Sequence, residues 1–197
     1  MSARPVALPG GHGLYEVRFH GRGGQGTVIA STLLAEAAFL EGRDVQAFPF
    51  FGVERRGAPV LAHTRIGEGQ IRLATSVRYP DAIIVMDPTL VRPGSPIFAS
   101  LRAGGDVLVN TVRPPRELQL AVDGHLASVD AVSVAIRHGL GSRANPIVNT
   151  VILGAFAKLT HVVELSSLEE AIRQKVPSHT DANIAAAREA YGLVEAA

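Results

Sequence analysis

Residues 15–42 read YEVRFHGRGGQGTVIASTLLAEAAFLEG, and the fold class follows from this stretch. Apolar and polar side chains alternate over 15–20, which is the period of a half-buried strand. Four glycines follow within 21–26, and apolar residues then recur at helical spacing until Gly42 ends the pattern. A strand, a glycine loop and a helix in this order are the opening of an α/β unit.

The rest of the chain continues the same pattern. Near-continuous apolar runs at 81–87 and 105–110 predict strands that are covered on both faces. The segment between them has the length of a crossover helix but is interrupted by Pro93 and Pro96. Further strands are predicted at 45–51, 60–66 and 71–75, the last two as a hairpin around 67–70, and further helices at 129–138, 147–159, from 166 onward and at 181–195.

We therefore expect an α/β fold, a single three-layer α/β/α domain with a Rossmann-like, mixed β-sheet. The length of 197 residues suits one domain. The domain is expected over residues 15–197. Residues 1–14, which are rich in proline and glycine, are expected to form a flexible N-terminal tail.

Composition excludes several classes of function. The 19 Lys and Arg residues balance 18 Asp and Glu residues, whereas a surface that binds nucleic acid through its phosphates needs a basic excess. The chain has no cysteine and so no thiolate ligand for an iron–sulfur cluster. It has no apolar run of about 18 residues and no secretory signal pattern, so we expect a cytoplasmic protein without a membrane span.

No spacing typical of a catalytic or metal site occurs. The seven histidines are scattered, without the H-E-x-x-H pattern of a zinc site. Neither a G-x-S-x-G nucleophile elbow nor a phosphate-binding G-x-x-x-x-G-K-S/T loop is present. Asp81 and Asp87 flank one strand, too far apart for a carboxylate pair. We therefore assign no catalytic residue and no metal ligand to this chain.

The glycine cluster is the first candidate site. Its G-x-G-x-x-G spacing between a strand and a helix allows a tight turn and brings an anion close to a helix N-terminus. A dinucleotide site also needs a carboxylate about 20 residues on, and the strand ending at Phe51 has none. Two interpretations stay open: a turn that only packs the helix on the sheet, or contact with an anion of a ligand or a partner subunit. The candidate anion-binding residues are Gly21, Arg22, Gly23, Gly24, Gln25 and Gly26.

The second candidate is the stretch FPFFGVERRG at 48–57. Aromatic residues and arginine are enriched at the centres of protein interfaces, and arginine pairs well with carboxylates. The stretch therefore predicts a subunit interface, while a solvated charged loop over a small apolar cluster is the alternative. The candidate interface residues are Phe50, Phe51, Glu54, Arg55, Arg56 and Gly57.

These two motifs together resemble the gamma subunit, or gamma domain, of the 2-oxoacid:ferredoxin oxidoreductases. The resemblance is strongest from His20 to Arg72, where the glycine loop is followed by QAFPFFGVERRGAPV at 46–60, and it extends from about Tyr15 to Tyr191. The form ERRGAP at 54–59 is similar to that of the pyruvate or branched-chain 2-oxoacid branch. Enzymes for aromatic 2-oxoacids, phenylglyoxylate or indolepyruvate, are the alternative. Further matching stretches are Pro80–Leu90, Val109–Thr111, Val129–Ala131 and Asn145–Leu159.

The resemblance implies a complex that decarboxylates a 2-oxoacid, with pyruvate as the expected substrate, and uses coenzyme A as co-substrate to give acyl-CoA and carbon dioxide. In this family thiamine diphosphate, Mg²⁺ and 4Fe–4S clusters lie on other subunits. The implied partners are alpha, beta and ferredoxin-like delta subunits, with ferredoxin or another electron acceptor. This chain would then bind no cofactor alone, would not be catalytic alone, and would contribute to assembly and to coenzyme A binding. A stand-alone NAD(P)-binding Rossmann protein and an adaptor without a ligand are the competing interpretations.

Overall fold

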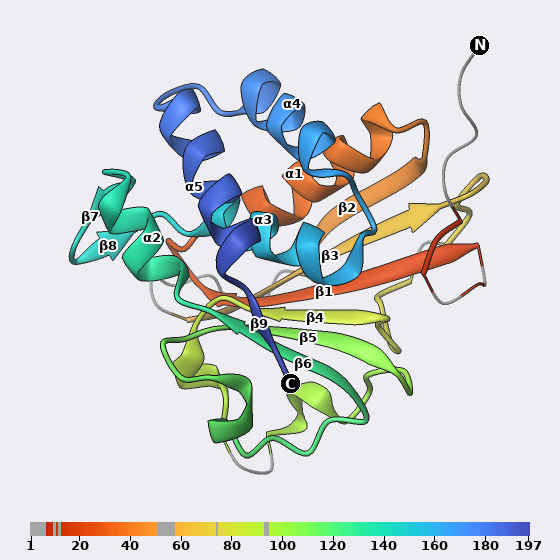
Figure 1. Ribbon diagram of the computed structural model, residues 1–197. Helices are drawn as coiled ribbons and strands as arrows, with labels where there is room; N and C mark the ends of the chain where they lie inside the picture. The colour runs from red at the N-terminus through yellow and green to blue at the C-terminus, as the bar shows by residue number, and fades with distance from the viewer. Residues whose placement is uncertain (1–6, 10, 12, 51–57, 74, 93–94) are drawn as a thin grey trace.

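The computed structural model describes residues 7–9, 11, 13–50, 58–73, 75–92 and 95–197 (Figure 1). Its centre is a mixed seven-stranded sheet with the order β2-β3-β1-β4-β5-β6-β9. Strands β1, β4, β5 and β6 run parallel, whereas β3 lies antiparallel between β1 and β2, and β9 pairs antiparallel with β6. The strands are β1 Leu14–Arg22, β2 Asp44–Phe50, β3 Pro59–Gly67, β4 Ala82–Val85, β5 Gly105–Asn110, β6 Gly124–Val129 and β9 Glu195–Ala196, with a separate pair β7 Gly141–Ser142 and β8 Asn145–Pro146.

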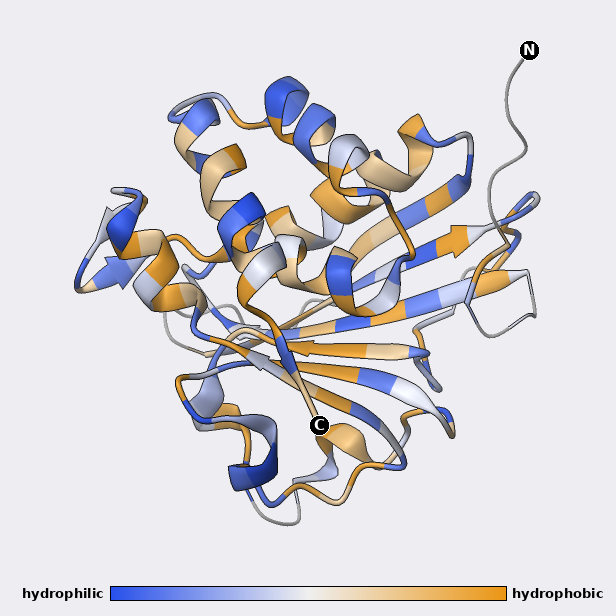
Figure 2. Ribbon diagram, in the orientation of Figure 1, coloured by the Kyte–Doolittle hydropathy of each residue, from blue (hydrophilic) through white to orange (hydrophobic). Residues whose placement is uncertain are grey.

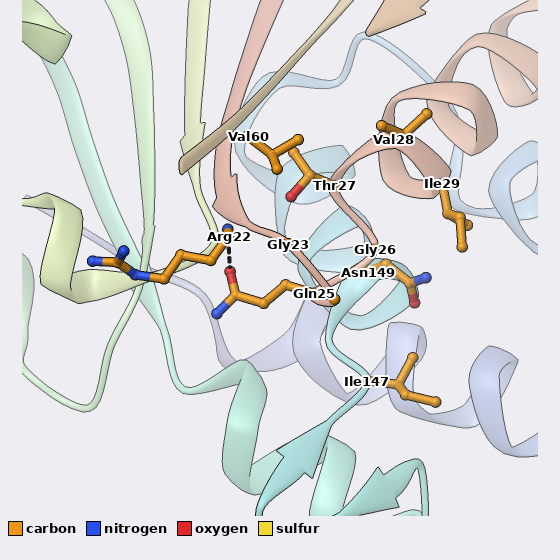
Figure 3. A pocket seen from close by; sticks show the side chains of 11 residues that line it. Arg22, Gly23, Gln25, Gly26, Thr27, Val28, Ile29, Val60, Ile147 and Asn149 are labelled. Carbon is orange, nitrogen blue, oxygen red and sulfur yellow. Dashed lines mark hydrogen bonds between the residues drawn. The ribbon is translucent and has the colours of Figure 1, made fainter. Parts of the chain in front are cut away.

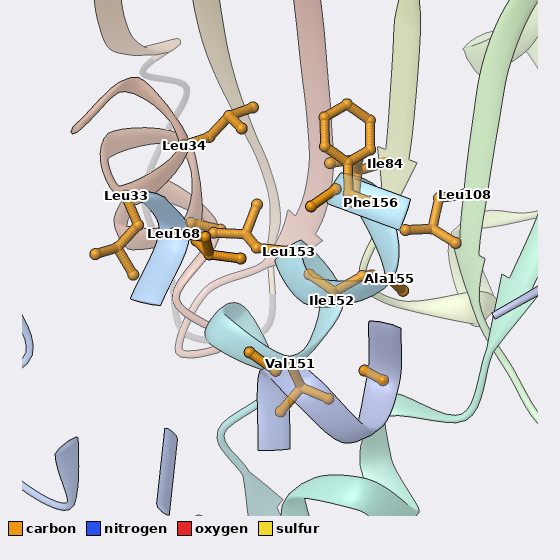
Figure 4. Packing of buried hydrophobic residues seen from close by; sticks show 14 of the residues in the cluster. Leu33, Leu34, Ile84, Leu108, Val151, Ile152, Leu153, Ala155, Phe156 and Leu168 are labelled. Carbon is orange, nitrogen blue, oxygen red and sulfur yellow. The ribbon is translucent and has the colours of Figure 1, made fainter. Parts of the chain in front are cut away.

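The α-helices of the described residues contribute to one core on one face of the sheet (Figure 1). Helix α3 lies at the centre of this layer, with ten of its twelve residues buried. Figure 4 shows Phe156 of α3 directed at the strands beside Ile84 and Leu108. The helices are α1 Thr27–Leu40, α2 Ala131–Arg137, α3 Asn149–Thr160, α4 Leu165–Lys175 and α5 Thr180–Leu193.

The opposite face of β4, β5 and β6 is covered by short 3-10 helices and loops, which form the third layer. A second, smaller hydrophobic core lies between this layer and the sheet, and its buried residues include Ile83, Val85, Val107 and Val109. Both faces of β4 and β5 are thus buried, as their continuous apolar runs predict, and Figure 2 shows hydrophobic residues gathered along them. The three 3-10 helices of the described residues are η1 Pro88–Leu90, η2 Pro96–Phe98 and η3 Pro115–Glu117.

These features confirm the predicted α/β class and the mixed sheet. The described residues between β4 and β5, by contrast, form 3-10 turns and not the expected crossover helix. Each of these turns begins at a proline, Pro88 or Pro96. Proline suits the first position of a helix but removes a hydrogen bond from its interior, so closely spaced prolines leave room only for short turns.

The predicted hairpin between 60–66 and 71–75 is wrong. Strand β3 forms, but β1 and β2 pair with its two edges, so it has no edge left for a third partner. Residues 71–73 lie outside any strand. This segment lies beside the buried guanidinium of Arg65, which donates to the carbonyl oxygens of Leu73 at 3.4 Å and Thr75 at 2.6 Å.

The segment expected as a flexible tail lies partly outside the described residues. In the described part, Leu8 is buried with 4% of its surface exposed. Its backbone N–H donates to Glu68 Oε1 at 2.9 Å, and Leu14 already belongs to β1, opposite Gly67.

Candidate functional site

The glycine loop lies at the carboxyl edge of the parallel strands. It follows β1 and leads into α1, and the chain then passes to the β2–β3 side of the sheet, whereas the chain after β4 passes to β5 on the other side. Neighbouring strands whose connections leave in opposite directions form a topological switch point, which is where open α/β sheets bind their ligands. The predicted candidate site therefore occupies the position in the fold that favours a ligand.

The outer glycines of the loop are required by packing. A Cβ atom added to Gly21 would lie 2.2 Å from Thr27 Oγ1, and one added to Gly26 would lie 2.7 Å from Asn149 Nδ2. Gly26 also has φ +75° at the N-cap of α1. Gly24 differs, because a Cβ added there would meet nothing within 4 Å. The packing interpretation is thus sufficient at the two ends of the loop, and the backbone at its centre faces open space.

Two cavities border the loop. The larger, of about 830 Å³, lies on the side of α1, where Ile29 and Ile147 are 53% and 46% exposed at its rim. Figure 3 shows Val28, Ile29, Val60, Ile147 and Asn149 around the loop backbone. The smaller, of about 370 Å³, lies on the side of Asn110 and the β8 segment. The loop therefore presents its backbone between an apolar rim and a second hollow.

Arg22 lines both cavities, but its guanidinium is directed away from the loop and from the other residues drawn in Figure 3. It pairs with Asp87, with Nε 3.2 Å from Oδ2, and its Nη2 donates to Thr89 Oγ1 at 2.7 Å. Gln25 completes this group, since its Oε1 accepts from the Arg22 N–H at 2.8 Å and its Nε2 donates to Asp87 Oδ2 at 2.8 Å.

Asp87 is ionised in this group. Burial by itself would raise the pKa of the carboxyl, but hydrogen bonds from Thr89 and Gln25 and the charge of Arg22 outweigh burial and lower the pKa. Sequence reasoning placed Asp87 at a strand end without a role, and it did not single out Thr89, Ile29 or Ile147. The available signal was that Asp87 lies two residues after the end of a buried parallel strand, at the edge where ligands bind.

The predicted interface motif approaches the same edge. Its residues 51–57 lie outside the described residues, and Phe50 is the last residue of β2. The chain resumes beside the glycine loop, where the Gly23 N–H donates to the Ala58 carbonyl at 3.0 Å and Arg22 lies opposite Pro59. The two motifs singled out from the sequence are therefore neighbours at this point.

Other ionisable groups of the described residues do not form a metal site. No three or more side chains of His, Cys, Asp or Glu come together there in an arrangement that suits a metal ion. Over the same residues, no helix combines the length and the apolar character needed to cross a bilayer.

Comparisons with known proteins agree over nearly the whole chain. The family model for pyruvate ferredoxin/flavodoxin oxidoreductases matches residues 16–193. The chain is 50% identical over 182 residues to the pyruvate/ketoisovalerate oxidoreductases common subunit gamma of Thermococcus litoralis, which covers 90% of this chain and 96% of the relative. It is 46% identical over 179 residues to the pyruvate synthase subunit PorC of Methanothermobacter marburgensis, with coverages of 90% and 96%. The crystal structure of the pyruvate oxidoreductase subunit PORC of Thermotoga maritima has a TM-score of 0.80 at 37% identity and covers 93% of this chain and 98% of that one.

Proposed function

The chain belongs to the pyruvate ferredoxin/flavodoxin oxidoreductase family as a gamma subunit, and we propose that within the assembled enzyme its glycine loop holds an anionic part of coenzyme A. The assembled enzyme oxidatively decarboxylates a 2-oxoacid with coenzyme A to acyl-CoA and carbon dioxide. We propose pyruvate as that 2-oxoacid, which ERRGAP at 54–59 and the names of the relatives support.

The proposal assigns the redox chemistry to partner chains. Thiamine diphosphate with Mg²⁺ and the 4Fe–4S clusters would lie on alpha, beta and delta subunits and pass electrons to ferredoxin. The absence of any cysteine supports this division, because a cluster needs thiolate ligands that this chain does not have. A cytoplasmic location belongs to the same proposal.

The larger cavity is the observation that carries the coenzyme A proposal. The first N–H groups of a helix have no carbonyl partner within the helix, and its dipole favours an anion there. At the start of α1 these groups border a cavity of about 830 Å³ whose rim includes the exposed apolar side chains of Ile29 and Ile147. A diphosphate attached to an aromatic base needs this combination of backbone donors and apolar wall.

The competing NAD(P) interpretation fits the sheet poorly. In a dinucleotide-binding fold, the strand next to β1 runs parallel to it and ends in the carboxylate that binds the ribose. Here β3 occupies that place and runs antiparallel, and β2 lies one strand further out. The topology therefore supports a ligand other than a dinucleotide bound in that way.

Two substitutions of Ile29 test whether an anion binds at the loop, because aspartate and asparagine differ in charge but have nearly the same shape. We expect Ile29→Asp to raise the KM for coenzyme A of the assembled enzyme on the order of three- to tenfold above that of Ile29→Asn, because a carboxylate at the rim repels a phosphate. The difference is expected to shrink in high salt. Both variants should fold, since an acidic residue in the first turn suits the helix dipole. Equal KM values for the two variants would contradict an anion at this loop.

A further inference from the structure

We propose that Asp87 is the positioning residue of the glycine loop, holding it in the form that receives coenzyme A. This inference rests on the proposed function above.

The carboxylate of Asp87 is held on both oxygens. It follows β4 and is 8% exposed. Its Oδ1 accepts from the Thr89 N–H at 2.9 Å and from Thr89 Oγ1 at 2.6 Å. Its Oδ2 accepts from Gln25 Nε2 at 2.8 Å and lies 3.2 Å from Arg22 Nε. One oxygen of the carboxylate is thus held by Thr89 of η1, and the other contacts the loop.

Gln25 connects Asp87 to the backbone of the glycine loop. Its Oε1 accepts from the Arg22 N–H at 2.8 Å, and its own N–H donates to the Arg22 carbonyl at 3.1 Å. Arg22 and Gln25 are therefore joined by two hydrogen bonds, and the Gln25 side chain connects them to Asp87, which follows β4. The intervening Gly23 and Gly24 have no side chain that would hold them, so their conformation depends on these contacts and on the hydrogen bond from the Gly23 N–H to the Ala58 carbonyl.

The same carboxylate also sets the direction of Arg22. With the guanidinium paired to Asp87 and bonded to Thr89, the space beside Gly24 stays open. The arginine charge in turn neutralises the carboxylate, so that Asp87 does not repel an anion arriving at the loop.

The donor and acceptor pattern allows a specific disruption and a specific rescue. Asp87→Asn removes the charge that faces Arg22 and places a side-chain amide N–H₂ against Gln25 Nε2, so that two donors meet. Adding Gln25→Glu restores the pattern, because the new carboxylate accepts both from the Arg22 N–H and from the asparagine amide. The double variant has the same net charge as the wild-type chain.

The experiment measures loop order and catalysis in the assembled enzyme. We expect Asp87→Asn to speed amide hydrogen exchange in the peptide over 21–30 and to raise the KM for coenzyme A on the order of tenfold, the size expected for loss of a hydrogen bond to a charged group. The kcat at saturating coenzyme A should change much less, which a general loss of stability would not produce. The Gln25→Glu/Asp87→Asn double variant should return the exchange close to wild type.

Asp130→Asn is the matched control. Asp130 follows β6 and caps α2 by accepting from the Ser133 N–H at 3.0 Å, and it lines a cavity other than the two that border the loop. Its variant should leave loop exchange and KM unchanged. Unchanged loop exchange in Asp87→Asn, or no rescue by the double variant, would overturn the positioning role. Faster exchange with an unchanged KM would instead overturn the coenzyme A site while the positioning role stands.

Discussion

His20 and His63 are buried on the sheet face opposite α1, with 8% and 2% of their surfaces exposed. The Nε2 atom of His20 accepts from Arg18 Nε at 3.1 Å, and the ring of His63 lies 5.2 Å from that of Phe48. Burial, followed by the positive charge of Arg18, lowers the pKa of His20 to about 3 and that of His63 to about 4. Both rings are therefore neutral in the folded chain at neutral pH.

Because the pKa values of these two histidines are lower in the folded chain than in the unfolded chain, we expect the fold to lose stability in acid. Below the unfolded pKa of about 6.5 the unfolded chain binds protons that the folded chain does not. The free energy of unfolding therefore decreases as the pH is lowered, by up to about 1.4 kcal/mol per pH unit for each histidine. The loss begins near pH 6.5 and continues to the folded values, about 4 for His63 and about 3 for His20. Urea unfolding of the purified chain between pH 7.5 and roughly pH 5 measures the slope.

Variants identify the source of that slope. His20→Gln or His63→Gln should reduce the pH dependence, since glutamine does not titrate. The exposed His161 serves as the control, and His161→Asn should leave the slope unchanged. A slope equal to wild type in both buried variants would assign the acid sensitivity to other groups.

At the scale of elements, helices α3 and α5 pack with their backbones in close contact. A Cβ added to Gly154 in α3 would lie 2.0 Å from the carbonyl oxygen of Ala187 in α5. Glycine is otherwise unfavourable in a helix interior by about 0.5–1 kcal/mol relative to alanine. Its presence here allows the two backbones to approach, and α3 in turn packs on the central strands.

Gly154→Ala should therefore destabilise the chain by about 1–3 kcal/mol, because the helices must separate and the surrounding core is overpacked. Gly192→Ala in α5 is the control, since a Cβ there meets nothing within 4 Å. It should leave stability unchanged or raise it by up to about 1 kcal/mol. Denaturant midpoints of the two variants measure the contrast, and a Gly154→Ala variant as stable as wild type would show that the helices do not cross this closely.

At the scale of the whole molecule, the predicted interface motif and the glycine loop meet at one edge of the sheet. The contact between Gly23 and Ala58 joins the loop to the end of the segment 51–57. A subunit that binds beside Ala58 would therefore also lie next to the loop. This arrangement links assembly to the site that we propose for coenzyme A.

Replacing both Arg55 and Arg56 with alanine should weaken assembly while the isolated chain stays folded, because loss of a buried interfacial charge pair costs about 2–5 kcal/mol. Retention of partner subunits after a salt wash of the tagged chain measures the effect. Arg173→Ala with Lys175→Ala removes the same charge from the partly exposed surface of α4 and should have little effect. Equal retention of partners by both double variants would exclude the motif as an assembly contact.

Local periodicity was enough to predict much of the fold. The strand, loop and helix over 15–42, the doubly buried strands β4 and β5, and the helices α2, α3 and α5 all follow from patterns within a few residues. Strand β6 was missed, because it begins with the exposed Gly124 and His125 and has no clear alternation. The false hairpin at 71–75 has a different origin, since a strand pattern does not say which edges are already occupied.

The sequence by itself also identified both candidate motifs, because a glycine loop and an arginine-aromatic stretch are local signals. Only the tertiary structure decided what surrounds the loop. Gln25 and Asp87 are 62 residues apart, and Arg22 and Thr89 are 67 residues apart. Such pairs meet because parallel strands place their carboxyl ends at one edge, and the order of strands in a sheet is not encoded in any short pattern. The direction of the Arg22 side chain depends on that order and on the buried carboxylate it brings near.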